Sequence, residues 1–264
     1  MKIIYWNTHK HNDLAPLEQI ILGKNPDFFF ISEFDITLKD GLSEFIFDNE
    51  YQILETPGCK RIMSIAKNTY QVELLTQNTH YTMLKTSVYE NEMYIIALHL
   101  PSQLYASLDS QKNYLRNLRY EIDSTIGKST DKNIIVIGDF NVNPFESPMI
   151  NFDGFGASNC KMARKKIKYQ NDEITTYINP TWQLYSRFNA PGTINYPRPS
   201  SYSFDVLEWH YLDQVVISQK LSELIIEDSI EIIEKINTLS FFNVDCRSVL
   251  ISDHLPIFYS FRSN

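Results

Sequence analysis

An acid and an amide directly follow one of the most apolar stretches of the chain. Residues 134–137 are all β-branched and apolar, and the next four are Gly138-Asp139-Phe140-Asn141. Such a run predicts a strand that is buried on both faces and ends near the glycine. If the extended backbone continues, Asp139 and Asn141 point to the same side and could hold a phosphate, a hard metal ion or an attacking water. The structural alternative is an Asx turn that ends the strand.

Polar side chains of catalytic type also stand at the ends of other apolar runs. Taken singly, each has a simpler interpretation as a solvated acid, a core histidine or a strand cap. Random placement rarely puts so many polar groups at strand ends while the strands themselves stay apolar, and functional sites are built on loops carried by a rigid scaffold. The set therefore predicts one active site, made by Asn7, Glu33, His99, Asp139, Asn141, Asp213, Asp253 and His254.

The chemistry of this set fits metal-assisted attack of water on a phosphate ester. Glu33 offers oxygen ligands suited to Mg²⁺, which takes one or two carboxylates and leaves its other positions to water and substrate phosphate. His254 is of the residue type that titrates near neutrality. A carboxylate that orients such a histidine usually comes from elsewhere in the fold, and Asp213 is the candidate.

The elements that must carry these groups alternate in type, which favours a layered α/β structure. Amphipathic periodicity predicts helices near residues 14–22 and 108–126. Residues 151–199 lack periodicity, and residues 221–236 fit either a strand or a helix. Short apolar runs bounded by turn residues predict strands at residues 2–6, 28–31, 61–67, 71–77, 79–88, 93–100, 134–137, 211–218 and 255–261.

Bulk properties agree with one globular unit. The 264 residues are 43% hydrophobic and show no repeat or linker, so we expect a single domain over residues 1–264. A net charge of −8 does not favour a protein held on nucleic acid by a broad basic surface, but it leaves room for a nuclease that holds phosphate through a metal. Without a signal-like or membrane-spanning apolar stretch, and with three scattered cysteines, we expect a cytoplasmic monomer with reduced thiols.

The motifs, taken in order, resemble the endonuclease/exonuclease/phosphatase superfamily. The resemblance extends from Lys2 to Phe261 and implies a four-layer α/β/β/α sandwich with two mixed, largely antiparallel sheets and a site at one edge of them. The matching motifs are Trp6-Asn7, Ile31-Ser32-Glu33, Gly138-Asp139-Phe140-Asn141, Leu212-Asp213 and Ser252-Asp253-His254-Leu255-Pro256.

The resemblance also implies a metal site. Glu33 would bind Mg²⁺, for which Mn²⁺ is a possible substitute, with Asn7 close by and also near the substrate. Asp253 would complete the metal and phosphate environment. His9 departs from the pattern, because repair enzymes of the superfamily often carry an acid two residues after the asparagine.

Four further roles follow from the same resemblance. Asp139 would align or deprotonate the attacking water, and Asn141 would hold the phosphate. His254, oriented by Asp213, would stabilise the charge of the transition state or act as the acid/base.

His99 indicates the branch of the superfamily. Its context, Leu98-His99-Leu100-Pro101, is closer to the deoxyribonuclease and lipid-phosphatase branches than to the apurinic endonucleases. In deoxyribonuclease a glutamate orients the equivalent histidine, whereas Lys60 stands at that place here. His99 is therefore held differently or acts as a phosphate donor.

The sequence indicates the type of reaction better than it indicates the substrate. Five cations between residues 161 and 168 form either a polyanion contact or a solvated face, and Arg187 and Arg198 are candidate phosphate contacts. We expect a phosphodiesterase or endonuclease that acts on DNA or RNA. The alternatives are a phosphatase or phosphodiesterase of the inositol phosphate or sphingomyelinase type, and a catalytically idle binding relative.

Overall fold

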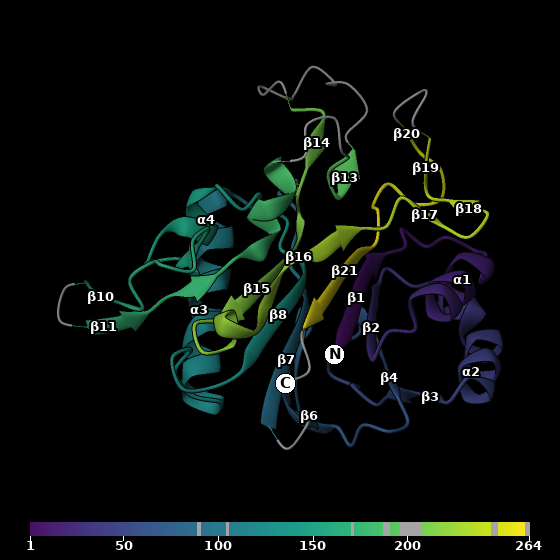
Figure 1. Cartoon of the computed structure of the whole chain (residues 1–264), viewed down its shortest axis with the longest axis horizontal. Coiled ribbons are helices and arrows are strands. Elements are labelled where there is room, and N and C mark those ends of the chain that lie inside the picture. Colours follow the sequence, from purple (N-terminus) through teal and green to yellow (C-terminus); the bar gives the residue numbers. More distant parts are fainter. Residues whose placement is uncertain are drawn as a thin grey trace.

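Two large sheets form the centre of the protein (Figure 1). The computed structural model describes residues 1–88, 91–103, 106–169, 172–186, 191–195, 207–243 and 248–261. The first sheet has the strand order β16 (Ile225–Ile232), β21 (Ile257–Phe261), β1 (Lys2–Asn7), β2 (Phe28–Ser32), β4 (Ile62–Lys67) and β3 (Tyr51–Leu54). The second has the order β5 (Glu73–Gln77), β6 (Tyr81–Val88), β7 (Asn91–His99), β8 (Ile134–Asp139), β15 (Asp213–Ser218), β12 (Tyr177–Ile178) and β9 (Ala157–Ser158).

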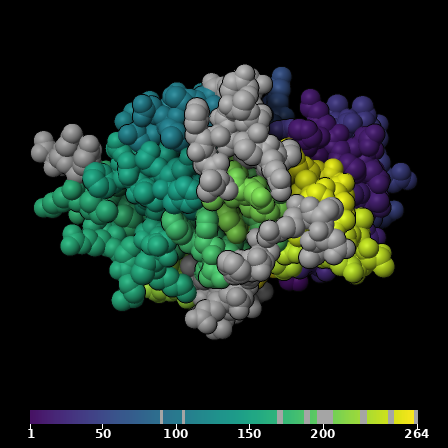
Figure 2. Space-filling view, turned by 90° about the horizontal axis from the view of Figure 1, so that it is seen from above, coloured from purple at the N-terminus to yellow at the C-terminus, as the bar shows by residue number. Residues whose placement is uncertain are grey.

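Both sheets are mixed and largely antiparallel, as predicted. Among the described strand pairs of the first sheet, only β1 and β2 run parallel, and in the second sheet the parallel pairs are β7 with β8 and β9 with β12. Figure 2 views the molecule from above, and the purple N-terminal and yellow C-terminal segments lie together there, as the pairing of β1 with β21 requires.

Helices cover the outer faces of the two sheets. In Figure 1, α1 (Ala15–Lys24) and α2 (Lys39–Asp48) lie beside the first sheet, and α3 (Leu108–Thr125) and α4 (Ser147–Ile150) lie beside the second. Pro16, with its fixed φ, lies in the first turn of α1, and Asn25 ends the helix in the left-handed conformation with φ 48°. The Ser107 side chain accepts the Ser110 N–H and so caps α3. The four-layer α/β/β/α arrangement is confirmed.

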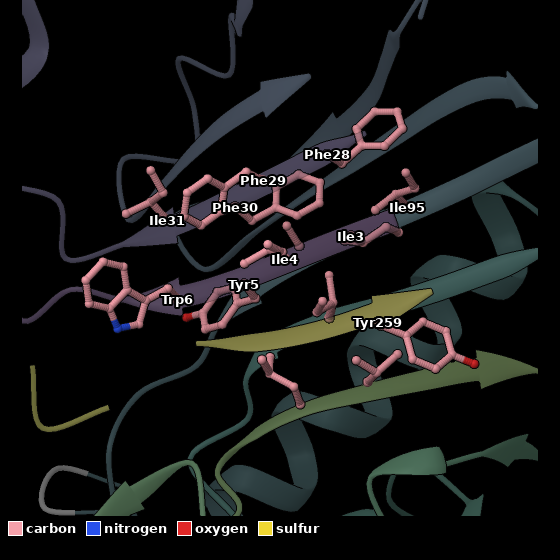
Figure 3. Close-up of a cluster of buried hydrophobic side chains, with 14 of the residues drawn as sticks. Ile3, Ile4, Tyr5, Trp6, Phe28, Phe29, Phe30, Ile31, Ile95 and Tyr259 are labelled. Carbon is pink, nitrogen blue, oxygen red and sulfur yellow. The ribbon is translucent and has the colours of Figure 1, made fainter. Parts of the chain in front are cut away.

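Strand β8 shows why the central strands are apolar on both faces. Ile134 and Val136 pack in the cluster that α3 closes, whereas Ile135 and Ile137 pack in the cluster shared with the first sheet. Successive side chains of a strand point to opposite faces, so a strand between two layers must be apolar at every position. Strands β1 and β2 follow the same logic, and Figure 3 shows their side chains filling the core.

The remaining elements are short. They include helical turns at Ile36–Leu38, Pro180–Ser186 and Leu221–Leu224, the last of which leads into β16, so residues 221–236 are mostly strand. Helix α2 and strand β3 were not predicted, and the last strand begins two residues later than predicted. Four small hairpins complete the list: β10 (Lys166–Tyr169) with β11 (Asp172–Thr175), β13 (Ile194–Asn195) with β14 (Trp209–His210), β17 (Lys235–Ile236) with β18 (Leu239–Ser240), and β19 (Phe242–Asn243) with β20 (Ser248–Val249).

A search of the described residues finds no helix with the length and apolar character needed to cross a membrane.

Candidate active site

Three of the predicted residues lie side by side at one end of the second sheet. Asp139 ends β8, and its register partners are His99 on β7 and Asp213 on β15. Side chains in register on neighbouring strands point to the same face. Asp139 lies two residues after Ile137, which packs toward the first sheet. The three polar side chains therefore continue the layer between the sheets at the point where the apolar residues stop.

The first sheet brings two more predicted residues to the same place. Asn7 ends β1 opposite Ser32 at the end of β2, and Glu33 follows with a left-handed φ of 49°. The Asn7 side-chain N–H donates to Glu33 Oε1 at 3.3 Å. His99 Nε2 lies 3.7 Å from Glu33 Oε1 and 3.7 Å from Asp139 Oδ2, so this ring stands between the carboxylates of the two sheets.

His254 and Asp213 form a buried hydrogen-bonded pair. The distance from His254 Nδ1 to Asp213 Oδ2 is 2.7 Å, and both side chains are almost fully buried. Burial by itself lowers the pKa of His254, but the charge and hydrogen bond of Asp213, with Asp139 and Asp253 behind them, raise the pKa to about 10. The ring is therefore a cation at neutral pH, held through Nδ1, which leaves Nε2 for a substrate.

Asp139 has the electrostatics of a base that works near neutrality. Burial and then the neighbouring Asp213 carboxylate raise the pKa of Asp139 to about 7, against a lowering by His254. Tyr5 lies nearby on β1. Burial, followed by the charges of Asp139 and Asp213, raises the pKa of its phenol, so Tyr5 stays neutral and donates to Ser32 Oγ at 2.7 Å. The sequence analysis did not identify Tyr5, which resembles any core aromatic.

Asn141 departs from the expectation of a continued strand. Its φ is 53°, so the backbone turns and the side chains of Asp139 and Asn141 do not follow strand alternation. The Asn141 N–H donates to Asp139 Oδ1 at 2.8 Å, which is an Asx turn, so the structural alternative and the site occur together. The Asn141 side-chain N–H donates to the Leu100 carbonyl at 2.8 Å and has one further N–H to offer.

Among the described residues, no carboxylate orients the His99 ring through Nδ1. Its Nδ1 is buried and has no hydrogen-bond partner among the residues that the structure describes. Burial, then the charges of Arg61 and His254, lower the pKa of His99 to about 3, so the ring is neutral. A neutral imidazole carries one N–H, and Nε2 is the nitrogen that faces the site.

Two carboxylates and a histidine form the part of the site that could hold a metal. His9 Nδ1 lies 3.7 Å from Glu33 Oε2 and 3.5 Å from Asp253 Oδ1, so an imidazole occupies the space between the two acids. Asn7 Oδ1 accepts the His9 backbone N–H at 3.1 Å and holds this loop in place. Hard oxygen donors facing one point fit a divalent cation, and His9 adds a nitrogen that the sequence analysis treated as a departure.

A second acidic group lies deeper. Donor atoms of Asp139, Asp213 and His254 all lie within 4.8 Å of one another, so these residues are also placed for a metal. The 2.7 Å hydrogen bond between His254 and Asp213 already uses two of the three donors. We therefore interpret this group as an acid–base pair beside a carboxylate, and the Glu33 side of the site as the better cation position.

Hydrogen bonds around His254 connect the end of β1 with the segment that precedes β21. Ser252 Oγ donates to the Asn7 carbonyl at 2.7 Å across 245 positions and accepts the His254 N–H at 3.1 Å. The Trp6 indole N–H donates to the His254 carbonyl at 3.0 Å. Thr193, which the sequence analysis did not identify, accepts the Asp213 N–H at 3.1 Å. These buried bonds fix the loop that carries the histidine.

Only some of the residues predicted to contact the substrate lie in the described part of the chain. Arg187 and Arg198 lie outside the described residues and stay predictions. The basic segment continues into the β10–β11 hairpin, which projects from the side of the molecule (Figure 1), and Lys166 there pairs with Glu173 at 2.7 Å. This placement favours the interpretation of that segment as a solvated face.

Comparisons with known proteins bear on the fold. No family model matches the sequence, and no curated protein matches it. Among solved structures, D. rerio TDP2 complexed with a single-strand DNA product has a TM-score of 0.65 at 16% identity, covering 100% of this chain and 99% of that one. A mannosyl-6-phosphatase from Bacteroides thetaiotaomicron has a TM-score of 0.58 at 13% identity, covering 100% of both chains.

A third structure carries the superfamily name. An endonuclease/exonuclease/phosphatase family protein from Bacteroides thetaiotaomicron has a TM-score of 0.57 at 12% identity and covers 98% of this chain and 96% of its own. The three alignments span nearly the whole chain, so the chain has the endonuclease/exonuclease/phosphatase fold, as its motifs predicted.

Proposed function

We propose that the protein is a divalent-metal-dependent hydrolase of phosphate esters, and that its substrates are nucleic acid phosphodiesters. One observation carries the proposal. A buried carboxylate, Asp139, lies beside the hydrogen-bonded pair of His254 and Asp213 and faces Glu33 of the other sheet across the ring of His99. A base, an acid and a cation position thus meet at one end of the sandwich.

The chain's own residues have separate tasks in the reaction. Asp139 holds the attacking water and takes up its proton, because its raised pKa suits a base near neutrality. His254 donates from Nε2 to a phosphate oxygen and stabilises the negative charge of the transition state, because Asp213 keeps the ring protonated. Asn141 and the neutral His99 are further donors at the rim of this centre.

Asn7, Glu33, Asp253 and the ring of His9 would hold the metal. A bound divalent cation would neutralise phosphate charge and polarise the ester. The oxygen donors favour Mg²⁺, and the imidazole makes Mn²⁺ an effective substitute.

Two neighbours of similar fold support different substrates. The TDP2 structure contains a single-strand DNA product, which supports a nucleic acid phosphodiester as the substrate. The mannosyl-6-phosphatase supports the second candidate, a phosphatase for a small phosphate ester. The idle binding relative has the least support, because the sequence retains Glu33, Asp139 and His254. We propose one catalytic domain, acting as a cytoplasmic monomer.

Hydrolysis assays with matched variants test the proposal. The purified protein is incubated with Mg²⁺ and, separately, with single-stranded DNA, RNA, inositol phosphates and bis(p-nitrophenyl) phosphate. We expect cleavage of at least one nucleic acid and a loss of roughly 10²–10⁴-fold in Asp139→Asn. Asp131→Asn is the control, since this exposed acid precedes the opposite end of β8. Release of phosphate from inositol phosphates alone would favour the second candidate, and full activity of Asp139→Asn would refute the assigned base.

A further inference from the structure

A hollow of about 770 Å³ opens directly beside the catalytic residues. Glu33 and His99 form part of its wall, so it is continuous with the proposed site. Most of the remaining wall comes from residues 34–39, which follow β2, and from residues 53–64, which run from the end of β3 into β4, and Lys10 of the loop after β1 completes it. This volume is within the range of pockets that bind small molecules and exceeds what a single phosphate group needs.

The rim of the hollow is cationic although the chain as a whole is acidic. Four cations line it, Lys10, Lys39, Lys60 and Arg61, against two carboxylates, Glu33 and Glu55. None of the four cations forms an ion pair with another residue in the part of the chain that the structure describes. Arg61 lines the same hollow as Glu33 and His99, so its charge faces the proposed site. These four cations gather in one place although the chain has a net charge of −8, so the rim of the hollow is a local site for an anion.

The wall between these cations is apolar. Phe34, Ile36 and Met63 line the hollow and are all at least partly exposed, and Ile36 is 67% exposed. A ring such as Phe34 offers a surface on which an unpaired base can stack. A cationic rim around an apolar wall suits a ligand that combines a phosphate with a flat apolar group.

We infer that this hollow binds the nucleotide next to the scissile phosphate in a single strand, with that nucleotide's phosphate on Lys60 and Arg61 and its base against Phe34. The inference rests on the proposed function and narrows its substrate class. The inference requires at least two phosphates in the substrate. It also gives a role to Lys60, which stands where deoxyribonuclease has a histidine-orienting glutamate. An unpaired base is required, because a base within a duplex cannot stack on a side chain.

Binding measured without hydrolysis tests the inference. Fluorescence anisotropy follows a labelled oligothymidylate with the full chain in EDTA, so that no metal-dependent cleavage occurs. We expect Lys60→Ala/Arg61→Ala to weaken binding roughly tenfold and to flatten the slope of log K against log salt by about 0.7, because the contact with one phosphate is lost. The matched control is Lys165→Ala/Lys168→Ala, which removes two exposed cations from the segment that forms the projecting hairpin.

The apolar wall has its own test. Phe34→Leu keeps an apolar side chain but removes the ring, so it should weaken binding of the oligothymidylate roughly fivefold or more and leave an abasic strand of the same length unaffected. Equal weakening for both strands would overturn the placement of the base.

Three outcomes overturn the inference as a whole. They are equal losses in the two double variants, no loss in either, and tighter binding of an inositol polyphosphate with the same dependence on Lys60 and Arg61, which would make the hollow a site for a small polyanion. Failure of the proposed function is distinct from these, because there the unmodified protein hydrolyses no phosphate ester at all.

Discussion

Replacing Asp213 by asparagine tests the electrostatic core of the site. Asparagine keeps the size of the side chain and an oxygen that can accept from His254 Nδ1, but it removes the charge. In the native protein the two atoms are 2.7 Å apart in a nearly dry environment, and the pKa of His254 is raised to about 10. Without the carboxylate, burial is the dominant influence and the pKa of His254 should fall to its ordinary value of about 6.5 or lower.

The change in charge state is large enough to measure directly. At pH 7 a ring with a pKa of about 10 is essentially all protonated, whereas at most about a quarter is protonated when the pKa is 6.5 or lower. Imidazole nitrogen NMR of the metal-free protein reads this fraction at His254. We expect hydrolysis to fall roughly 10²–10⁴-fold at the same time, because the acid is lost. Asp27→Asn is the control, since this acid pairs with Lys67 at the opposite end of β2.

The same substitution predicts a pH dependence of stability. The folded-state pKa of His254 is above its unfolded value, so the pair stabilises the fold fully below about pH 6.5, and this contribution is lost as the pH rises toward 10. The difference in unfolding free energy between the native protein and Asp213→Asn should therefore shrink from pH 6.5 to 9.5, by up to about 1.4 kcal/mol per pH unit. Urea denaturation measures it. A ring that stays protonated above pH 8 in the variant, or a difference that grows with pH, would refute the reasoning.

Three shorter predictions concern other parts of the site. Gly138→Ala should lower the unfolding free energy by about 3 kcal/mol, because φ is 147° and a Cβ would collide with a carbonyl of the neighbouring strand. Gly127→Ala has a φ of 119° and its Cβ would meet only the Lys132 side chain at ordinary contact distance, so it should cost about 1 kcal/mol in the same urea titration. His9→Ala should weaken Mn²⁺ binding roughly tenfold and Mg²⁺ binding less, measured by calorimetry; equal losses would contradict a nitrogen ligand. Ser252→Ala should cost about 1–3 kcal/mol in thermal unfolding, because a buried carbonyl and N–H lose their partner.

The sheets were predictable because their apolar runs have few other interpretations. Residues 134–137 are apolar at every position, and only a strand between two layers buries both of its faces. Helix α2 and strand β3 escaped prediction because partly exposed elements need few apolar residues: Leu42 and Ile46 are the buried positions of α2. The order and register of the strands could not be predicted from the sequence. Which strand lies beside β8 depends on contacts between residues that are far apart in the chain.

The types and motif spacing of Glu33, Asp139, Asp213 and His254 were sufficient to predict the chemistry, because few reactions use carboxylates, amides and a histidine in this combination. Gly138-Asp139-Phe140-Asn141 illustrates the limit. The sequence left a turn and a catalytic corner as alternatives, and the structure contains both in the same residues, because one oxygen of Asp139 closes the Asx turn while the other faces His99.

The sequence by itself determined which side chains are candidates for the chemistry and which runs form the two sheets, because residue type and local periodicity are properties of the chain. Only the tertiary structure decided what each group stands next to. His9 reaches Glu33 and Asp253 together, and four scattered cations line one hollow beside the site, because the fold brings distant segments within a few ångströms of one another. Electrostatic interaction and desolvation depend on those distances, so the ionisation of Asp139 and His254 is a property of the folded protein.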